Sequence, residues 1–146
     1  MRTEECIFFQ LAKAGQSSAQ YWQGKVAPLG LTAVQAMVLN TLSDDDGAPA
    51  GRLGERVQLT SATLTGIVDR LENLGFVERR ASKTDRRAVL VCLTAKGREA
   101  VGEIKPLLAD ANREFLAGLS PEDQTQLRGL LQKLRDSRQG GAALSA

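Results

Sequence analysis

Apolar residues recur every three to four positions along much of this chain, and breaks in the pattern divide it into elements. The first stripe covers residues 3–29 and predicts a helix with Thr3 as its N-cap. A second helix is expected to begin after Thr32, its N-cap, and to end in an acidic stretch that closes at Gly47. A short extended segment is expected at 48–50.

The middle of the chain carries two helical patterns followed by two short β-type runs. A short helix at 53–57 lies three residues before a longer helix at 61–74, which Gly75 closes, and this spacing is typical of a helix-turn-helix. The runs at 76–80 and 86–93 are joined by a short polar segment and predict a hairpin. Together these elements predict a winged helix.

Two further helices are predicted in the last third of the chain. Thr94 caps the first, which is expected to kink rather than break at Pro106, because a proline removes one backbone hydrogen bond. Ser120 as N-cap and Pro121 at the first helical position predict the start of the last helix. Residues 139–146 are predicted to be a flexible tail.

Helices with leucine stripes flank a middle module that has its own small core. These stripes could fold back on the module, but pairing with a second copy explains long helices at both ends better. We therefore predict a homodimer in which 1–31 and 99–138 form a helical dimerisation region and 32–98 form the winged helix-turn-helix. The predicted fold class is mainly α, with a small β component.

Composition argues against most enzyme classes. The chain has no histidine, which is the commonest general base and a common metal ligand, and it has no glycine-rich phosphate-binding loop. Cys6 and Cys92 are far apart and form no metal-binding or disulfide pattern. We predict no enzymatic activity, no metal site and no cofactor. No apolar run approaches the roughly 18 residues that cross a bilayer, so we expect a cytoplasmic protein without a membrane partner.

Charge is unevenly distributed along the chain. The net charge is only +2, but residues 52–98 hold ten basic and five acidic residues, a net charge of +5, and the remainder carries −3. Such a basic region is expected of a nucleic-acid-binding protein, although ordinary solvated surfaces show it too.

The predicted helix at 61–74 has one apolar face and one face of short side chains. The apolar stripe consists of Leu64, Ile67, Val68, Leu71 and Leu74. On the other side, short residues would let the backbone approach a major-groove wall closely, and the helix N-terminus near Thr60 and Ser61 would suit a phosphate. Thr60 or Ser61 is equally explained as an ordinary N-cap.

The segment ERRASKTDRRAVLV concentrates positive charge in the predicted hairpin. It holds five cations, namely Arg79, Arg80, Lys83, Arg86 and Arg87, and a single inner acid, Asp85. Clustered cations repel one another, but this cost is offset when a polyanion binds along them. An arginine at a hairpin tip can also enter a narrow minor groove. Asp85 could hold the Arg87 guanidinium in place. A solvated basic turn is the alternative.

The stretch LTSATLTGIVDRLENLGFVERRASKTDRRAVLVCLTAKG resembles the signature of the multiple antibiotic resistance regulator (MarR) family of winged-helix transcription factors. The resemblance implies a triangular dimer that presents two winged helices to a palindromic duplex operator. Matching positions place the following residues near the major groove: Thr60, Ser61, Ala62, Thr63, Thr65 and Arg70. Arg87, set by Asp85, would enter the minor groove, and the remaining hairpin cations Arg79, Arg80, Lys83 and Arg86 would bind the backbone.

Members of this family usually repress a nearby gene or their own operon and release DNA when a small aromatic effector binds between the dimer helices and the DNA-binding lobe. By resemblance, the candidate wall residues here are Phe8, Tyr21, Trp22, Val26 and Met37, each of which is also explained as core or dimer interface. One branch of the family senses peroxides through a cysteine near the start of the first helix. Cys6 lies close to that place, although alignment on GLT puts Phe8 there. A winged helix that binds an acidic protein is a further alternative.

Overall fold

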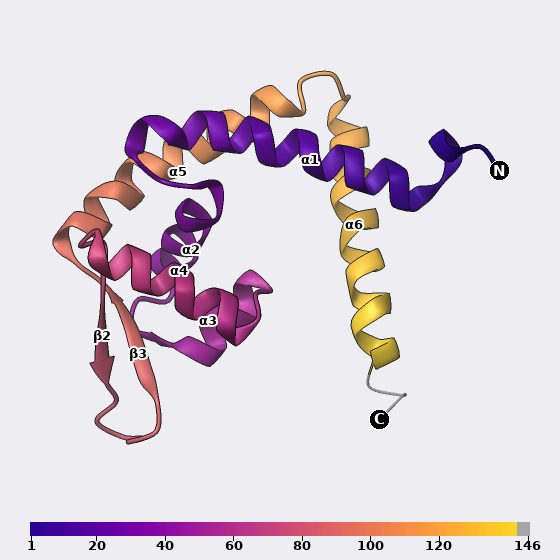
Figure 1. Cartoon of the computed structure of the whole chain (residues 1–146). Coiled ribbons are helices and arrows are strands. Elements are labelled where there is room, and N and C mark those ends of the chain that lie inside the picture. Colours follow the sequence, from indigo (N-terminus) through magenta and orange to yellow (C-terminus); the bar gives the residue numbers. More distant parts are fainter. Residues whose placement is uncertain (143–146) are drawn as a thin grey trace. The chain divides into compact units, whose positions relative to one another are not determined.

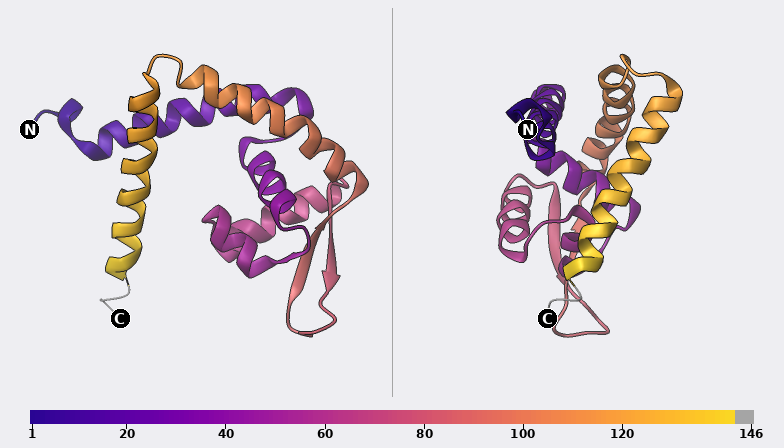
Figure 2. Two further views of the ribbon diagram at one scale, coloured as in Figure 1. Left: turned by 180° about the vertical axis from the view of Figure 1, so that it is seen from behind. Right: turned by 90° about the vertical axis from the view of Figure 1, so that its right-hand side faces the viewer.

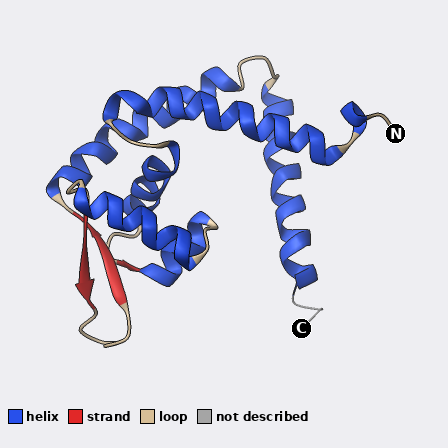
Figure 3. Cartoon of the chain, viewed as in Figure 1, coloured by secondary structure: helices blue, strands red, loops and turns tan. Residues whose placement is uncertain are grey.

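The structure, a computed structural model, describes the backbone of residues 1–142 and the side chains of residues 1–138 (Figure 1). In chain order its elements are η1 (Thr3–Glu5), α1 (Ile7–Val26), η2 (Ala27–Leu29), α2 (Ala33–Asp44), β1 (Ala48–Pro49), α3 (Ala50–Val57), α4 (Ser61–Asn73), β2 (Val77–Ala81), β3 (Val89–Leu93), α5 (Ala95–Phe115) and α6 (Pro121–Ala142). Helices dominate and the strands are short, which confirms the predicted mainly α class (Figure 3). The chain divides into two compact units, Met1–Ala111 and a second that begins at Asn112.

The first helix begins later than the sequence pattern predicts. Thr3 opens a separate 3-10 turn rather than capping α1, whose N-cap position is Cys6. The reason lies in Glu5, because its carboxylate accepts hydrogen bonds from the Arg2 backbone N–H (3.2 Å) and guanidinium (3.1 Å) and closes a turn of its own. The prediction of Thr3 as N-cap is therefore wrong.

The start of α2 follows the prediction and is tied to α1. Thr32 Oγ1 accepts a hydrogen bond from the Gln35 backbone N–H (3.2 Å), and Gln35 Oε1 accepts one from Thr32 N–H (2.9 Å), which makes a capping box. Trp22 Nε1 donates to the Ala33 carbonyl (3.2 Å), and Gln23 Oε1 accepts from Ala33 N–H (2.8 Å). These bonds fix the corner between α1 and α2.

Helix α4 packs its apolar stripe into the core. Thr60 Oγ1 caps the helix by accepting from Thr63 N–H (3.3 Å). Four of the five predicted stripe residues are buried, namely Leu64, Ile67, Val68 and Leu71. Leu74 is exposed, contrary to the prediction, because it is the C-cap residue where the chain turns out of the helix through Gly75, whose φ is +81°. A positive φ is a conformation that glycine adopts readily.

The sheet is antiparallel with strand order β1–β3–β2. Ala48 pairs with Val91, and β2 pairs with β3 from Val77 opposite Leu93 to Ala81 opposite Val89. Figure 2 shows the hairpin of β2 and β3 extending beyond α3 and α4. Residues 82–88 form its connecting loop, called the wing loop below.

The sequence pattern predicts a strand over 86–93, but Arg86 and Arg87 belong to the wing loop. Ala88 N–H donates to the Asp85 carbonyl (3.0 Å), and Ser82 N–H donates to the Ala88 carbonyl (3.2 Å). The Ser82 bond continues the register of the ladder, but the turn takes the Ala88 N–H, which would otherwise donate to Ser82, and the paired strand begins at Val89.

One core joins α2, α4, the sheet and the first half of α5. The largest fully buried side chains are Leu39, Leu42, Leu53, Leu71, Ile104, Val26, Val38, Val68, Val77 and Val91. The outward surface of α4 and the base of the hairpin therefore lie over one continuous apolar core.

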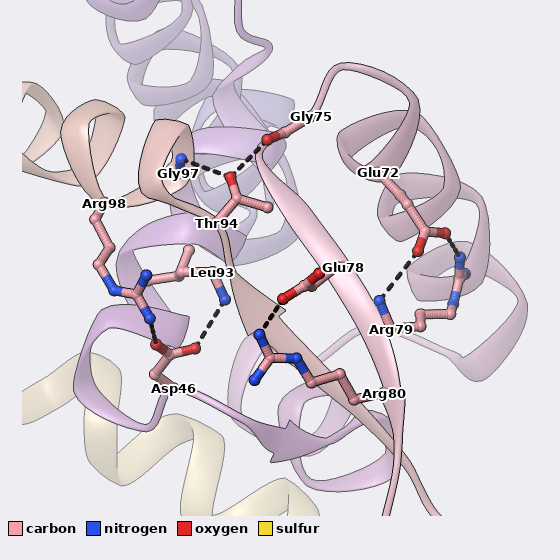
Figure 4. A network of polar contacts seen from close by, with 10 residues as sticks. All are labelled: Asp46, Glu72, Gly75, Glu78, Arg79, Arg80, Leu93, Thr94, Gly97 and Arg98. Atoms are coloured by element: carbon pink, nitrogen blue, oxygen red, sulfur yellow. Dashed lines mark hydrogen bonds and ion pairs between the residues drawn. The ribbon is translucent and has the colours of Figure 1, made fainter.

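The junction between β3 and α5 is closely packed (Figure 4). Thr94 Oγ1 donates to the Gly75 carbonyl (2.6 Å) and accepts from Gly97 N–H (3.1 Å), which confirms the predicted cap. Asp46, in the loop after α2, accepts from Leu93 N–H (2.8 Å) and from the Arg98 guanidinium (2.9 Å). The start of α5 is thus attached both to the turn after α4 and to the loop after α2.

The last two helices begin as predicted. α5 continues through Pro106 as one helix, and Asp123 N–H donates to Ser120 Oγ (3.1 Å) at the start of α6. α6 continues to Ala142, four residues into the segment predicted to be a flexible tail, and residues 143–146 lie outside the described residues. Within residues 1–142 no single helix has the length and apolar composition to cross a membrane, and only α1 with η2 and α2 together, bent by 77°, reach that combination.

Gly97→Ala is expected to destabilise the fold by about 1 to 3 kcal/mol or more in urea unfolding, because overpacking displaces its neighbours. A Cβ at position 97 would lie 2.0 Å from the Phe76 carbonyl oxygen. The control is Gly66→Ala in α4, where a Cβ meets nothing within 4 Å and should stabilise the helix by up to about 1 kcal/mol. Equal stability of the two variants would contradict the close contact at the junction.

Candidate nucleic-acid interface

The outward side of α4 is a surface of short side chains, called the α4 face below. Its members, all exposed, are Ser61, Ala62, Thr63, Thr65 and Gly66. Thr65 Oγ1 donates to the Ser61 carbonyl (2.8 Å), and Thr60 Oγ1 donates to Thr63 Oγ1 (3.0 Å). The hydroxyl hydrogens of Thr60 and Thr65 are therefore used within the helix. The short side chains of the α4 face would not prevent a partner from approaching the helix backbone closely.

The two remaining residues predicted for this helix lie at its ends. Thr60 caps α4, so the free backbone N–H groups of the first turn open beside it. Arg70 is exposed in the last turn, one turn beyond Gly66. The structure thus brings all six predicted recognition residues to one helix, five of them within its N-terminal half or at its cap.

The wing loop carries exposed positive charge at the tip of the hairpin. Lys83, Arg86 and Arg87 are all exposed there. Asp85 Oδ1 accepts from the Arg87 backbone N–H (3.0 Å), and Asp85 N–H donates to Ser82 Oγ (3.2 Å). Within the described part of the chain, no ion pair joins Asp85 to the Arg87 guanidinium. The expectation that Asp85 holds the guanidinium is wrong, since the carboxylate binds the backbone two residues on and shapes the loop.

Arg79 lies between two carboxylates of α4, an arrangement called the Arg79 bridge below. Its Nη1 lies 2.6 Å from Glu72 Oε2, and its Nη2 lies 2.6 Å from Asp69 Oδ1. Its backbone N–H also donates to Glu72 Oε1 (3.0 Å; Figure 4). Only 29% of the side chain is exposed. Arg79 was predicted to bind a polyanion backbone, but here it ties β2 to α4.

Sequence reasoning missed Asp69 and Glu72 as members of this site. Both lie on the outward half of α4, one turn apart, where unpaired carboxylates would repel a phosphate backbone. Their position in the sequence could have indicated this role, because two acids beside a proposed anion-binding face require a cationic partner. The partner is seven residues beyond Glu72, on the following strand.

The carboxylate of Glu72 is held ionised by this contact. The hydrogen bond from the Arg79 backbone N–H lowers the pKa of Glu72 most, followed by the hydrogen bond from the guanidinium. Burial lowers the pKa of Arg79, but the hydrogen bonds to Asp69 and Glu72 outweigh it, and the pKa of Arg79 is raised. Both ends of the bridge therefore favour the charged state.

Arg80 points away from this face. It forms an ion pair with Glu78, two residues earlier on the same strand and therefore on the same side of the sheet (Figure 4). The hydrogen bond to Glu78 raises the pKa of Arg80. The five predicted cations thus separate into three at the hairpin tip and two paired arginines on opposite sides of β2.

The candidate effector residues do not form one cluster within a chain. Phe8 is 79% exposed near the start of α1, and Tyr21 lies thirteen residues later on the same helix, about 20 Å along its axis. Val26 is buried, and Met37 is exposed on α2. Trp22 is half-buried and contributes its N–H to the corner between α1 and α2.

The two cysteines are free thiols in different parts of the fold. Cys6 is a half-buried free thiol at the N-cap position of α1, and Cys92 is a buried free thiol in β3. In the part of the chain that the structure describes, no group of three or more cysteine, aspartate or glutamate side chains is arranged to hold a metal ion. Peroxide sensing through Cys6 remains a prediction.

Comparison with known proteins identifies the family to which this chain belongs. The transcriptional regulator HosA of Escherichia coli is 32% identical over 130 residues, which cover 89% of this chain and 95% of HosA. The MarR family model matches residues 31–89. The chain belongs to the MarR family. The matched segment runs from the start of α2 to the start of β3, so it contains the α4 face and the wing loop.

Two solved structures of DNA-binding proteins share this fold over nearly the whole chain. BpsR of Bordetella bronchiseptica, whose DNA binding is regulated by 6-hydroxynicotinic acid, is 28% identical with a TM-score of 0.87 over 93% of this chain and 97% of its own. The repressor CouR of Rhodococcus jostii, solved bound to a 23-mer DNA duplex, is 25% identical with a TM-score of 0.84 over 90% and 94%. This MarR protein is thus a DNA-binding transcriptional regulator with a winged helix.

Arg79→Ala should lower the free energy of unfolding by about 1 kcal/mol, because it removes the link between β2 and α4 and leaves two carboxylates unpaired. Lys83→Ala, at the exposed hairpin tip, is the matched control and should change stability by less than about 0.5 kcal/mol. Chemical denaturation of both variants measures the difference. An Arg79→Ala protein as stable as the control would show that the bridge does not hold the hairpin.

Glu72→Gln should destabilise the protein at neutral pH and have little effect in acid. Because the folded-state pKa of Glu72 lies below its ordinary value of 4.5, its stabilising contribution is present above pH 4.5 and is lost as the pH falls through the lowered pKa. Denaturation of wild type and variant between pH 7 and pH 3 measures this convergence. In an Arg79→Ala background the backbone N–H at position 79 still bonds to Glu72 and only the guanidinium is lost, so the pH-dependent effect of Glu72→Gln should shrink without disappearing. An effect as large as in the wild-type background would show that the guanidinium does not contribute to the lowered pKa.

Proposed function

We propose that this MarR protein is a ligand-responsive dimeric repressor of a palindromic duplex operator. The α4 face enters the major groove and the wing loop lies along the neighbouring minor groove. The observation that supports this most directly is the Arg79 bridge, because it holds an exposed cationic loop at a fixed position beside a helix face without long side chains.

Electrostatics favour a nucleic acid over an acidic protein as the partner. The charged groups of the wing loop, Lys83, Arg86 and Arg87, are exposed, and the two acids of α4 are already paired with Arg79. Phosphate contacts by these cations release counterions, and Arg87 at the tip suits the negative potential of a narrow minor groove. Interfaces with proteins usually depend on aromatic or arginine side chains that the partner buries, and the α4 face contains none.

Dimerisation is supported by apolar residues that each compact unit leaves exposed. In α1 they are Ile7, Phe8, Phe9 and Leu11, and in the second unit they are Phe115, Leu119, Leu127, Leu130, Leu131 and Leu134. Monomeric proteins rarely expose so many large apolar side chains on so few helices. A second copy that covers them would present two winged helices to two half-sites about one turn of duplex apart.

The effector is proposed to be a small aromatic molecule bound between the subunits. Phe8 is too far from Tyr21 to share a wall with it inside one chain, so the five candidate residues would meet only if a second copy supplied part of the site. The regulation of BpsR by 6-hydroxynicotinic acid supports this class of ligand by similarity.

Arg87→Ala should weaken operator binding by about tenfold or more, since a lost groove contact costs about 1 to 3 kcal/mol, and wild-type affinity should fall steeply with salt. Arg80→Ala is the matched control because Arg80 pairs with Glu78 on the other side of β2, and it should change affinity less than threefold. Fluorescence anisotropy with labelled duplex measures affinity, and light scattering measures the subunit number. A monomer in solution, or binding that ignores salt, would contradict the proposal.

A further inference from the structure

The hydroxyl of Thr65 is occupied within its own helix. Thr65 Oγ1 donates its hydrogen to the Ser61 carbonyl (2.8 Å), although Thr65 lies on the exposed side of α4. A threonine hydroxyl has a single hydrogen to donate. The side chain therefore has no hydrogen-bond donor left for a partner, although its oxygen can still accept a hydrogen bond and its methyl group can make apolar contacts.

Thr65 is exposed and has small neighbours on its own helix, and the Arg79 guanidinium lies beside its backbone, with Nη2 3.5 Å from the Thr65 carbonyl oxygen. Ala62 lies one turn earlier on the same face, and it adds only a second methyl group. Gly66 is adjacent, and even a Cβ built there would meet nothing within 4 Å. The nearest acids of the helix, Asp69 and Glu72, are held by Arg79. A partner surface can thus come within van der Waals distance of Thr65.

The major groove offers one apolar group to such a side chain. Each base pair shows a distinct set of donors and acceptors there, and only thymine adds a methyl group, at C5. A methyl group without a donor beside it gains nothing from guanine O6 or N7, but it can exclude water from the thymine methyl group. The contact therefore selects thymine by apolar burial rather than by hydrogen bonding.

We propose that Thr65 is a specificity-determining residue that recognises a thymine in each operator half-site through a methyl-to-methyl contact. The inference rests on the proposed major-groove placement of α4. Cytosine, which lacks the methyl group, is discriminated against at that position. The Thr65 hydroxyl holds the side-chain rotamer by its bond to Ser61 and makes no contact with the base.

Replacement of thymine by deoxyuridine tests this directly, because it removes one methyl group and leaves all base pairing unchanged. A duplex that binds the protein is first selected from a pool of random sequences. It is then synthesised again in a series of probes, each with deoxyuridine in place of thymine at one position, changed in both half-sites. Wild-type affinity, measured by anisotropy at fixed salt, should fall about fourfold per half-site contact at one position. The other thymine positions provide the internal comparison.

Two variants of Thr65 separate the methyl group from the hydroxyl. Thr65→Ser keeps a hydroxyl that can bond to Ser61 and removes only the methyl group, so it should bind the thymine and deoxyuridine probes equally at that position. Thr65→Val keeps a methyl group and removes the oxygen, so it should still prefer thymine by about fourfold per half-site contact. Both changes are on an exposed helix surface, and thermal unfolding checks that both proteins are folded.

The possible outcomes distinguish this inference from the proposed function. If wild type binds duplex DNA but treats thymine and deoxyuridine alike at every position, the methyl contact is overturned and the proposed function stands. The same conclusion follows if Thr65→Val loses the preference and Thr65→Ser keeps it, since the oxygen would then be the reading group. If no duplex is recovered from the pool, the proposed function itself fails.

Discussion

The guanidinium of Arg79 contacts Asp69 and Glu72 at once, and this contact governs the arrangement of the proposed DNA-binding surface. β2 is attached to α4 along its outward half, so the wing loop has a defined direction relative to the helix face. The same contact offsets one of the two negative charges that the carboxylates of Asp69 and Glu72 would otherwise bring beside a phosphate backbone. The planar guanidinium serves both acids because each of its two terminal nitrogens contacts a different carboxylate, in a fixed geometry that the compact ammonium group of a lysine does not have.

The helix-turn-helix could be predicted from the sequence because its determinants are local. The caps at Thr32, Thr60, Thr94 and Ser120 are each set by residues within three positions, and the left-handed Gly75 ends α4 where the pattern indicates. Leu74 shows the limit of periodicity, since the helical repeat continues to it while the backbone has already begun to turn. Thr3 shows the same limit at the other end, where Arg2 and Glu5 form a competing turn.

The site was only partly predictable, because its geometry depends on contacts between elements. The exposed cations of the wing loop and the short residues of α4 follow from composition and spacing alone. The different roles of the two adjacent arginines do not, because strand alternation sends Arg79 toward α4 and Arg80 to the other side of the sheet. Asp85 likewise bonds to a backbone group two residues away rather than to a guanidinium, a choice that depends on the turn that the loop adopts.

The strand order β1–β3–β2 leaves two strands at the edges of the sheet, where unpaired backbone groups can recruit strands of other molecules. β1 has only two residues, and the second, Pro49, has no N–H to offer. β2 carries charged side chains at three successive positions, Glu78, Arg79 and Arg80. The arginines that shape the hairpin therefore also protect an open β-edge from self-association, which allows an extended wing to persist without aggregating.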